Sequence, residues 1–378
     1  MKFWIKKAAL THAVSQVSKV VSQKTTIPIL TGIKAVLAEE GLYLTGSNSD
    51  MTIQVFIPTK EEDEEQIMVE ETGSIVLPGR IFTDIIRKLP GDRVEWEVNA
   101  AKQVLIQSQQ AKFELIGLDA EEFPRLPHLS TNQSFYIHAN ILGNMIRQTY
   151  FAVSADEAKM VLTGVLWKLQ SGKLTFIATD GHRLAKRSTP IEGADDFTLS
   201  NTIVPGKSMA ELAKTIQDID EAVEILVADN QLLVKTNRMH FFTRLIEGKY
   251  PETDDFIPKD WKTKVTGTTR ELMESVDRAS LINRAAHDDV VKWTINEENI
   301  EISSISQEIG KVTERIDVHV EGSPLEISFN PRYMMDALRS IDREDIIIQF
   351  KGAMAPFTIQ PKEDQDTLYL ILPIRTHS

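Results

Sequence analysis

The sequence predicts an α+β protein in which one domain plan occurs three times in tandem. The first observation behind this prediction is an internal repeat: Leu30-Thr31-Gly32 recurs as Leu162-Thr163-Gly164, and the same spacing places Phe3 on Phe135 without a gap. A repeat with so long a period is a copied domain rather than a small repeated motif. At 378 residues the chain has room for two or three domains of ordinary size.

The second observation is a turn that recurs with the repeat. Ile75–Arg80 reads IVLPGR, Thr202–Lys207 reads TIVPGK, and Ser328–Arg332 reads SFNPR. Each segment is a short apolar run that ends in a proline-bearing turn, which is typical of a strand followed directly by a helix. The third copy is the weakest in sequence but keeps this order. We expect three domains, at residues 1–128, 129–257 and 258–378.

The helices predicted after these turns carry charged and apolar residues on separate faces. Each has a basic residue near its start and an acid four positions later, so that the pair shares one helix face. Residues such as Ile81, Ile85 and Leu89 supply the apolar stripe that packs on a sheet. Each copy is therefore expected to be a sheet covered on one face by two helices. The charged pairs are Arg80 with Asp84, Lys207 with Glu211, and Arg332 with Asp336.

Within each copy the predicted order is a short strand, an amphipathic helix, two strands, a linking loop, a strand that ends in the turn, a second helix and a final strand pair. The middle strands are clearest at Val161–Leu169 and Leu174–Ala178, on either side of the turn residues 171–173. Because sheet edges must be paired or blunted, we expect antiparallel sheets that continue from one domain to the next on the outside, with helices inside. Two chains that close a ring would leave no edge exposed.

The composition is that of a soluble globular protein, with 42% hydrophobic and 26% charged residues. No window offers the roughly 18 uninterrupted apolar residues of a membrane helix, and the N-terminal residues lack the core of a signal peptide. The absence of cysteine excludes disulfides and thiolate metal sites and fits a reducing compartment. We expect a cytoplasmic protein without a membrane partner.

The charge distribution bears on nucleic-acid binding. A net charge of −13 argues at first against such a partner. Acids gather in loops such as Glu61–Glu65, however, whereas nearly every predicted helix is net basic. For any single helix, an ordinary lysine-rich solvated face explains the charge equally well. Agreement among the helices favours a basic concave surface on an otherwise acidic body.

Motifs of catalysis and cofactor binding are absent from the sequence. Gly206-Lys207-Ser208 resembles the end of a phosphate-binding loop, but Asn201 stands where that motif needs glycine. The histidines lack metal-ligand spacing, so we expect no catalytic residues, no cofactor and no metal. One alternative stays open: a nucleotide-handling enzyme that uses Asp180 and His182 as an acid–base pair. The two residues flank a turn, where an aspartate ordinarily stabilises the turn itself.

Motifs spread over the whole chain carry a resemblance to one family. They are MKFWI at 1–5, IPILTG at Ile27–Gly32, TDGHRLA at Thr179–Ala185, Tyr250-Pro251 before Ile257-Pro258, FNPRY at Phe329–Tyr333 and LPIR at Leu372–Arg375. With these motifs the chain resembles the bacterial DNA polymerase III beta subunits, the replicative sliding clamps. The resemblance implies three clamp domains of one fold and a head-to-tail homodimer that encircles duplex DNA. It also implies loading by an ATP-dependent clamp loader, and processivity for the replicative polymerase without a reaction of the clamp's own.

The resemblance further implies three sets of site residues. A hydrophobic cleft between the second and third domains receives a short linear motif from polymerases, the clamp loader and repair proteins, with His182 and Arg183 as polar handles. For the C-terminal segment Leu372–Arg375 taken alone, an alternative to a role in the cleft is an apolar strand that merely completes a sheet. The implied cleft residues are Leu162, Thr179, Gly181, His182, Arg183, Leu184, Pro251, Phe256, Tyr333, Leu370, Leu372, Pro373, Ile374 and Arg375. The implied DNA-facing residues are Lys24, Arg80, Arg147 and Lys207, and the implied dimer interface joins Phe113 and Leu115 to Leu281 and Ile282.

Overall fold

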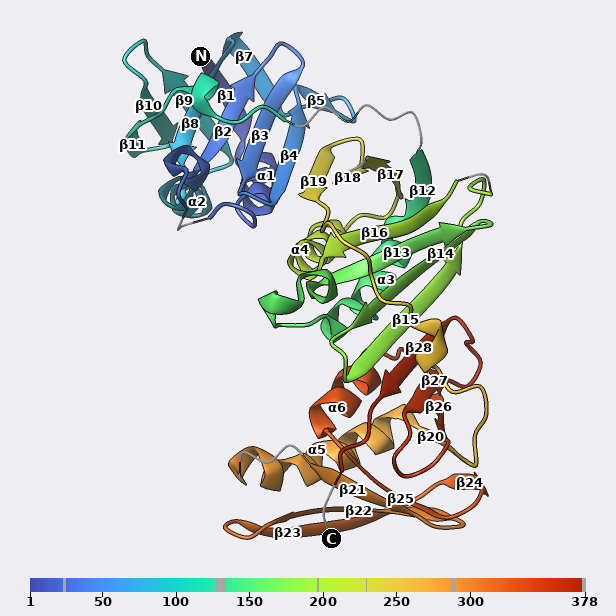
Figure 1. Cartoon of the computed structure of the whole chain (residues 1–378). Coiled ribbons are helices and arrows are strands. Elements are labelled where there is room, and N and C mark those ends of the chain that lie inside the picture. The colour runs from blue at the N-terminus through green and yellow to red at the C-terminus, as the bar shows by residue number, and fades with distance from the viewer. Residues whose placement is uncertain are drawn as a thin grey trace. The chain divides into compact units, whose positions relative to one another are not determined.

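The computed structural model describes residues 1–22, 25–126, 129, 134–195, 197–228, 230–286 and 290–375, excluding the side chains of 283–286. The chain forms two compact units, whose helices and strands are labelled in Figure 1. The first unit is Met1–Asn140 with Glu211–Leu245, and the second is Ile141–Ala210 with Ile246–Ser378. The division cuts through the second sequence repeat, because some strands of that repeat complete a sheet of the first unit and others a sheet of the second.

The first unit contains two large antiparallel sheets and the short β5-β6 hairpin. The larger sheet has the strand order β12-β17-β18-β19-β4-β3-β2-β8, and the smaller has the order β11-β10-β9-β1-β7. Burial alternates along the strands: on β9, Val94 and Trp96 are buried while their neighbours are exposed. Helix α1 (Lys7–Val17) packs on β4 and on α2 (Gly79–Lys88), whose Phe82 is fully buried.

The strands of the first unit are β1 (Lys2–Lys6), β2 (Gly32–Leu37), β3 (Gly41–Ser47), β4 (Met51–Pro58), β5 (Lys60–Glu61), β6 (Glu64–Glu65), β7 (Ile67–Glu71), β8 (Gly73–Pro78), β9 (Arg93–Val98), β10 (Gln103–Ser108), β11 (Ala111–Ile116), β12 (Ser134–His138), β17 (Ala222–Ala228), β18 (Gln231–Lys235) and β19 (Met239–Arg244). Its 3₁₀ helices are η1 (Pro28–Thr31) and η2 (Ala120–Glu122). Helices α3 (Ala139–Arg147) and α4 (Gly206–Ile216) cross the division between the units.

The second unit contains a nine-stranded sheet in the order β16-β13-β14-β15-β28-β27-β26-β20-β24 and a four-stranded sheet in the order β23-β22-β21-β25. Helix α5 (Thr269–Ala286) packs on β22 and β23 and against α6 (Pro331–Arg339). Helix α6 begins where it does because Pro331 fits the first turn and the side chain of Asn330 accepts the backbone N–H of Arg332 at 2.9 Å.

The strands of the second unit are β13 (Gly164–Gln170), β14 (Lys173–Thr179), β15 (Arg183–Pro190), β16 (Leu199–Pro205), β20 (Thr263–Thr268), β21 (Val291–Ile295), β22 (Asn299–Ser306), β23 (Gly310–Asp317), β24 (His319–Gly322), β25 (Leu325–Phe329), β26 (Asp345–Phe350), β27 (Phe357–Pro361) and β28 (Thr367–Ile371). Its 3₁₀ helices are η3 (Tyr150–Ala152), η4 (Glu157–Thr163) and η5 (Asp254–Phe256). None of the described helices combines the length and apolar character that a membrane crossing requires.

Sheets continue from one sequence repeat to the next, as predicted. In the first unit, β19 pairs antiparallel with β4, with Phe241 opposite Ile53. In the second unit, β15 pairs with β28, with Leu184 opposite Leu370 (Figure 1). Each pairing turns two unsatisfied sheet edges into one hydrogen-bonded ladder, so the prediction of shared edges is confirmed at both places.

The repeat is also confirmed by the buried residues. Phe3, Phe135 and Val265 are buried in β1, β12 and β20, the first strand of each copy. Trp167 and Trp293 are fully buried in β13 and β21, the first strand after the first helix of the second and third copies. Equivalent sequence positions therefore occupy equivalent places in the core.

The predicted order of elements needs one correction. Among the described residues, each copy has at least three strands between its first helix and the strand that ends in the turn, where the sequence predicted two. Each copy also ends with three strands instead of the predicted pair. In the second copy the additional strand is β15, which carries Arg183, Lys186 and Arg187 and so lacks the apolar alternation that predicts a strand. Pairing with β14 on one side and β28 on the other stabilises it, and no local pattern reveals those partners.

Candidate binding cleft

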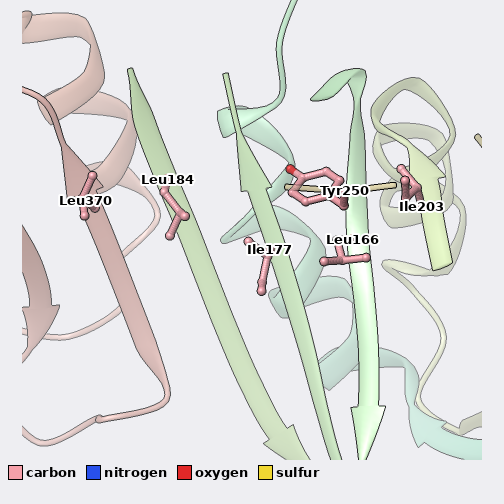
Figure 2. Close-up of a cluster of buried hydrophobic side chains, with 6 residues drawn as sticks. All are labelled: Leu166, Ile177, Leu184, Ile203, Tyr250 and Leu370. Carbon is pink, nitrogen blue, oxygen red and sulfur yellow. The ribbon is translucent and has the colours of Figure 1, made fainter. Parts of the chain in front are cut away.

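An apolar cluster lies on one face of the nine-stranded sheet (Figure 2). Leu166, Ile177 and Ile203 are direct cross-strand partners on β13, β14 and β16. Leu184 and Leu370 are direct partners on the neighbouring strands β15 and β28. Side chains that stand opposite each other project to the same face of a sheet and pack together. Five adjacent strands thus contribute one apolar side chain each.

Tyr250 covers part of this face (Figure 2). Its side chain is buried, and its phenol oxygen accepts the backbone N–H of Thr179 at 3.1 Å. Its own backbone N–H donates to the side-chain oxygen of Asn201 at 3.0 Å. Burial raises the pKa of Tyr250, so the phenol stays neutral. The ring is therefore fixed as a neutral, apolar cover that is anchored at both ends.

The rim of the cluster is only partly buried. Among the described residues each rim side chain keeps part of its surface accessible to solvent, and the neighbouring Phe256 is 59% exposed. A contiguous apolar surface that stays open to solvent is typical of an interaction site. The rim side chains are Val161, Leu162, Ile246, Ile257, Leu368 and Leu372.

The turn between β14 and β15 is built by its own side chains. Asp180 accepts the backbone N–H groups of His182 at 2.8 Å and of Arg183 at 3.1 Å. The hydroxyl of Thr179 donates to the carbonyl of Arg183 at 2.6 Å. Gly181 has a φ of +95°, a conformation that side chains disfavour. The segment TDGHR thus encodes a well-defined turn on which the side chain of His182 is exposed.

The carboxylate of Asp180 is committed to this turn. One oxygen accepts the two backbone N–H groups, and the other accepts the Nε–H of Arg183 at 3.0 Å. A catalytic acid–base pair needs its carboxylate on the histidine ring, whereas Asp180 binds the His182 backbone. The geometry is that of a turn-stabilising aspartate and disfavours the nucleotide-handling alternative.

Arg183 points inward. Its Nη1 donates to Asp336 on α6 at 2.5 Å and its Nη2 to the carbonyl of Phe151 at 2.6 Å, and its side chain is only 11% exposed. The sequence suggested His182 and Arg183 together as handles for a peptide. In the structure the side chain of His182 is exposed, whereas Arg183 is engaged in intramolecular hydrogen bonds. The sequence did not predict these bonds, because Asp336 and Phe151 come from distant parts of the chain.

The C-terminal segment Leu372–Arg375 passes beside the 179–184 turn. The backbone N–H of Leu372 donates to the carbonyl of His182 at 2.9 Å, and that of Ile374 donates to the carbonyl of Ser328 at 2.7 Å. This segment therefore lengthens the β15-β28 ladder by one hydrogen bond and then turns to β25. Completing a sheet is part of what it does, and Leu372 also packs on the apolar cluster.

The implied cleft residues lie at different depths. Leu162, Leu184, Leu370 and Leu372 belong to the cluster, and Thr179, Gly181, His182 and Arg183 form the turn beside it. Pro373 and Ile374 are half-buried, and Pro251, Phe256 and Arg375 are exposed. The ring of Tyr333 lies 4.6 Å from the guanidinium carbon of Arg183.

Sequence reasoning missed the floor of the cleft. Leu166, Ile177 and Ile203 read as ordinary strand residues, because the sequence does not show which sheet face stays uncovered. Tyr250 carried a usable signal: the repeat aligns it with Phe123, which is buried in a corresponding cluster of the first copy.

One row of the corresponding sheet face in the first unit is polar. The repeat aligns Thr45 with Ile177 and Gln54 with Lys186, and His240 is the strand partner of Gln54 as Leu368 is the strand partner of Lys186. Gln54 lies between Thr45 and His240 on the sheet and donates to Thr45 Oγ1 at 3.2 Å. A hydrogen-bonded pair of polar side chains thus stands in this row of the first unit, whereas Leu30, Val76 and Phe123 form an apolar cluster there as their counterparts do in the cleft.

The other implied residues are on the surface where described. Arg80, Arg147 and Lys207 are exposed on α2, α3 and α4, and Lys24 lies outside the described residues. Lys207 is 3.6 Å from Glu157, whereas Arg80 forms no ion pair among the residues described. On the proposed interface, Phe113 and Leu115 lie on the edge strand β11, Leu281 is 58% exposed on α5, and Ile282 is half-buried there.

Tandem α+β domains joined by continuous antiparallel sheets are the fold of the DNA sliding clamps. Family models for the N-terminal, central and C-terminal domains of the DNA polymerase III beta subunit match residues 1–127, 136–252 and 254–375. The chain belongs to the DNA polymerase III beta subunit family. It is a DNA sliding clamp, a replication protein without catalytic activity of its own, with DNA and polymerase as partners.

The relatives agree over the full length. The chain is 45% identical to the beta sliding clamp of Bacillus subtilis and 43% identical to that of Staphylococcus epidermidis, with 100% of each chain covered. Among solved structures, the DNA polymerase sliding clamp from Bacillus subtilis matches with a TM-score of 0.97 at 45% identity. The DNA polymerase III beta chain from Streptococcus pneumoniae matches with a TM-score of 0.95 at 34% identity. Both matches cover 100% of both chains.

Proposed function

We propose that two copies of the chain join head to tail into a ring around duplex DNA in the cytoplasm. The ring tethers the replicative polymerase and so confers processivity. The cleft beside His182 receives a short linear motif of the polymerase, the clamp loader and repair proteins in turn. The observation that carries the docking function is a partly open apolar sheet face beside an exposed histidine.

The proposed domains are residues 1–128, 129–257 and 258–378. The three family matches and the buried residues shared by the repeats support this division. Each domain supplies two helices, and the ring places these helices toward the DNA. Phosphate contacts by exposed cations such as Arg80, Arg147 and Lys207, together with Lys24, hold any DNA sequence equally and permit sliding.

Two free sheet edges support the head-to-tail dimer. β11 ends the five-stranded sheet and β23 ends the four-stranded sheet, and both strands are largely exposed. Exposed edge strands with apolar side chains are avoided in soluble monomers. Pairing of β11 from one chain with β23 of the other satisfies both edges. Because α5 packs on β23, this pairing brings Phe113 and Leu115 near Leu281 and Ile282.

The dimer is tested by the mass of the protein in solution, measured by light scattering after size exclusion. We expect twice the chain mass of 42.6 kDa. Leu281→Asp places a charge in the proposed interface and should give the mass of one chain. Met354→Asp is the control, because Met354 is 57% exposed, like Leu281, but belongs to the loop between β26 and β27 and to neither edge strand. A single-chain mass for the unaltered protein would contradict the ring.

The cleft is tested with fluorescent peptides that tile the replicative polymerase of the source cell. His182→Ala should weaken the tightest-binding peptide about fivefold or more, as expected when a central polar contact is lost. His319→Ala is the control, because this histidine is exposed on β24, outside the cleft. Equal affinity of the His182→Ala variant and the unaltered protein would count against the site.

A further inference from the structure

Arg183 joins three segments of the second unit. It belongs to β15 at the end of the 179–184 turn, it binds the carbonyl of Phe151 in η3, and it binds Asp336 in α6. Its guanidinium carbon also stands 5.5 Å from the ring centroid of Phe151 and 4.6 Å from that of Tyr333. These contacts link the turn that carries His182 to the helix that carries Tyr333.

The spacing on α6 explains how one guanidinium reaches both of its partners there. Tyr333 and Asp336 are three residues apart and therefore lie on the same helix face. A planar guanidinium has donors along its edge and a cationic face, so Arg183 can donate to Asp336 while it covers the ring of Tyr333. Two charge-assisted pairs, to Asp180 and Asp336, fix its orientation.

In this arrangement little of the Arg183 side chain is accessible to a peptide. The side chain is 11% exposed, and Asp180 and Asp336 are themselves only 15% and 28% exposed. A direct ionic contact with a peptide would require the guanidinium to leave one of these carboxylates. Removing one partner of a largely buried ion pair is strongly destabilising, because the other charge is left uncompensated.

We propose that Arg183 is a positioning residue of the cleft. Through Asp180 and Asp336 it holds the His182 turn and the ring of Tyr333 in the arrangement that a peptide meets, and it does not bind the peptide itself. This inference rests on the proposed docking function of the cleft. It assigns a role to Asp336, which lies outside the set of implied lining residues.

The decisive variant is Asp336→Asn. It keeps Arg183 and every implied lining residue, and it removes only the charge that holds the guanidinium on α6. Positioning predicts that peptide affinity falls by roughly fivefold, because the charge-assisted hydrogen bond becomes a neutral one of about half the strength. It also predicts that Arg183→Ala with Asp336→Asn is no weaker than Arg183→Ala alone. If Arg183 binds the peptide directly, Asp336→Asn leaves the affinity unchanged or raises it, because the guanidinium is then easier to release, and either result would overturn the proposal.

A neighbouring ion pair supplies the matched control. Arg187 lies on the same strand, and its Nη1 donates to Asp364 at 2.5 Å, also between β15 and a segment of the third repeat. It has no described contact with Tyr333 or the turn. Asp364→Asn should therefore leave peptide affinity unchanged. An equal loss in Asp364→Asn and Asp336→Asn would mean that general loosening of the sheet weakens binding, and the positioning role would be wrong.

A spectroscopic signal separates this proposal from the docking function. With fluorotyrosine incorporated, the ¹⁹F resonance of Tyr333, assigned through Tyr333→Phe, should shift in Asp336→Asn and stay in place in Asp364→Asn, both without peptide. If no polymerase peptide binds the unaltered protein, the docking function fails while this shift still reports on the positioning contact. An unshifted resonance in Asp336→Asn would refute the positioning contact even where peptides bind.

Discussion

The phenol oxygen of Tyr250 accepts the backbone N–H of Thr179 at 3.1 Å beside the apolar cluster of the cleft. This hydrogen bond ties the segment after β19 to the last residue of β14, directly before the His182 turn. Tyr250 is 3% exposed, so its hydroxyl has little access to water as an alternative partner. One buried hydroxyl therefore connects the cover of the apolar cluster to the exposed turn.

Tyr250→Phe keeps the ring and removes this acceptor. The backbone N–H of Thr179 then lacks its partner, at a cost of about 1 kcal/mol. We predict that hydrogen exchange of the Thr179 amide becomes roughly fivefold faster, which corresponds to that free energy. Exchange measured by NMR or mass spectrometry checks this. Unchanged protection of Thr179 would show that the hydrogen bond does not stabilise the turn.

Gly181→Ala probes the backbone of the turn. Gly181 has a φ of +95° and open space around it, so the added methyl group meets no atom and only the backbone conformation is strained. We expect a cost of about 1 to 2 kcal/mol, which is relieved by a change in the turn, and weaker peptide binding. Gly352→Ala is the control, because Gly352 also has open space but no left-handed φ. Equal peptide affinity in both variants would contradict a role of the turn geometry.

Acid should weaken the second unit through Asp364. Burial acts to raise the pKa of this carboxyl, but the backbone N–H of Asp366, the hydroxyl of Thr367 and the Arg187 guanidinium outweigh it and hold the pKa below 3.8. A depressed folded-state pKa means that the stabilisation is complete above the ordinary pKa and is lost as the pH falls through the folded-state value. We predict that the thermal midpoint falls less steeply below pH 3.8 in Asp364→Asn than in the unaltered protein. Parallel curves from calorimetry would contradict this.

The affinity for DNA should depend more on Arg80 of α2 than on Lys207 of α4. Arg80 has no ion-pair partner among the described residues, whereas Lys207 is 3.6 Å from Glu157, which offsets part of its charge. We predict that Arg80→Ala lowers the slope of log affinity against log salt by about 0.9, the value for one phosphate contact, and Lys207→Ala by less. Fluorescence anisotropy with a short duplex at several salt concentrations measures both. A larger effect of Lys207→Ala would reverse the assignment.

Much of the fold could be predicted from the sequence because the chain repeats itself. The match of Leu30–Gly32 with Leu162–Gly164 and the shared apolar positions are local patterns, and they predicted three copies of one plan with continuous sheets. Strand β15 could not be predicted in this way, because Arg183, Lys186 and Arg187 hide its alternation and its partner β28 lies far along the chain.

The candidate site also has a part that could be predicted from local sequence and a part that could not. The motif TDGHR predicted a turn, and its hydrogen bonds are all local. The inward orientation of Arg183 depends on Asp336 and Phe151, which no spacing in the sequence relates to it. The apolar floor was missed because local alternation shows which residues share a face but not whether that face is covered.

The direct measurement of clamp function is retention on DNA of two topologies. The protein is incubated with the proposed clamp loader and ATP on nicked circular duplex DNA and is then washed at roughly 1 M salt, where phosphate contacts are screened. A closed ring stays on the circle through this wash and runs off once a restriction enzyme linearises the DNA. Equal retention on circular and linear DNA would contradict topological binding.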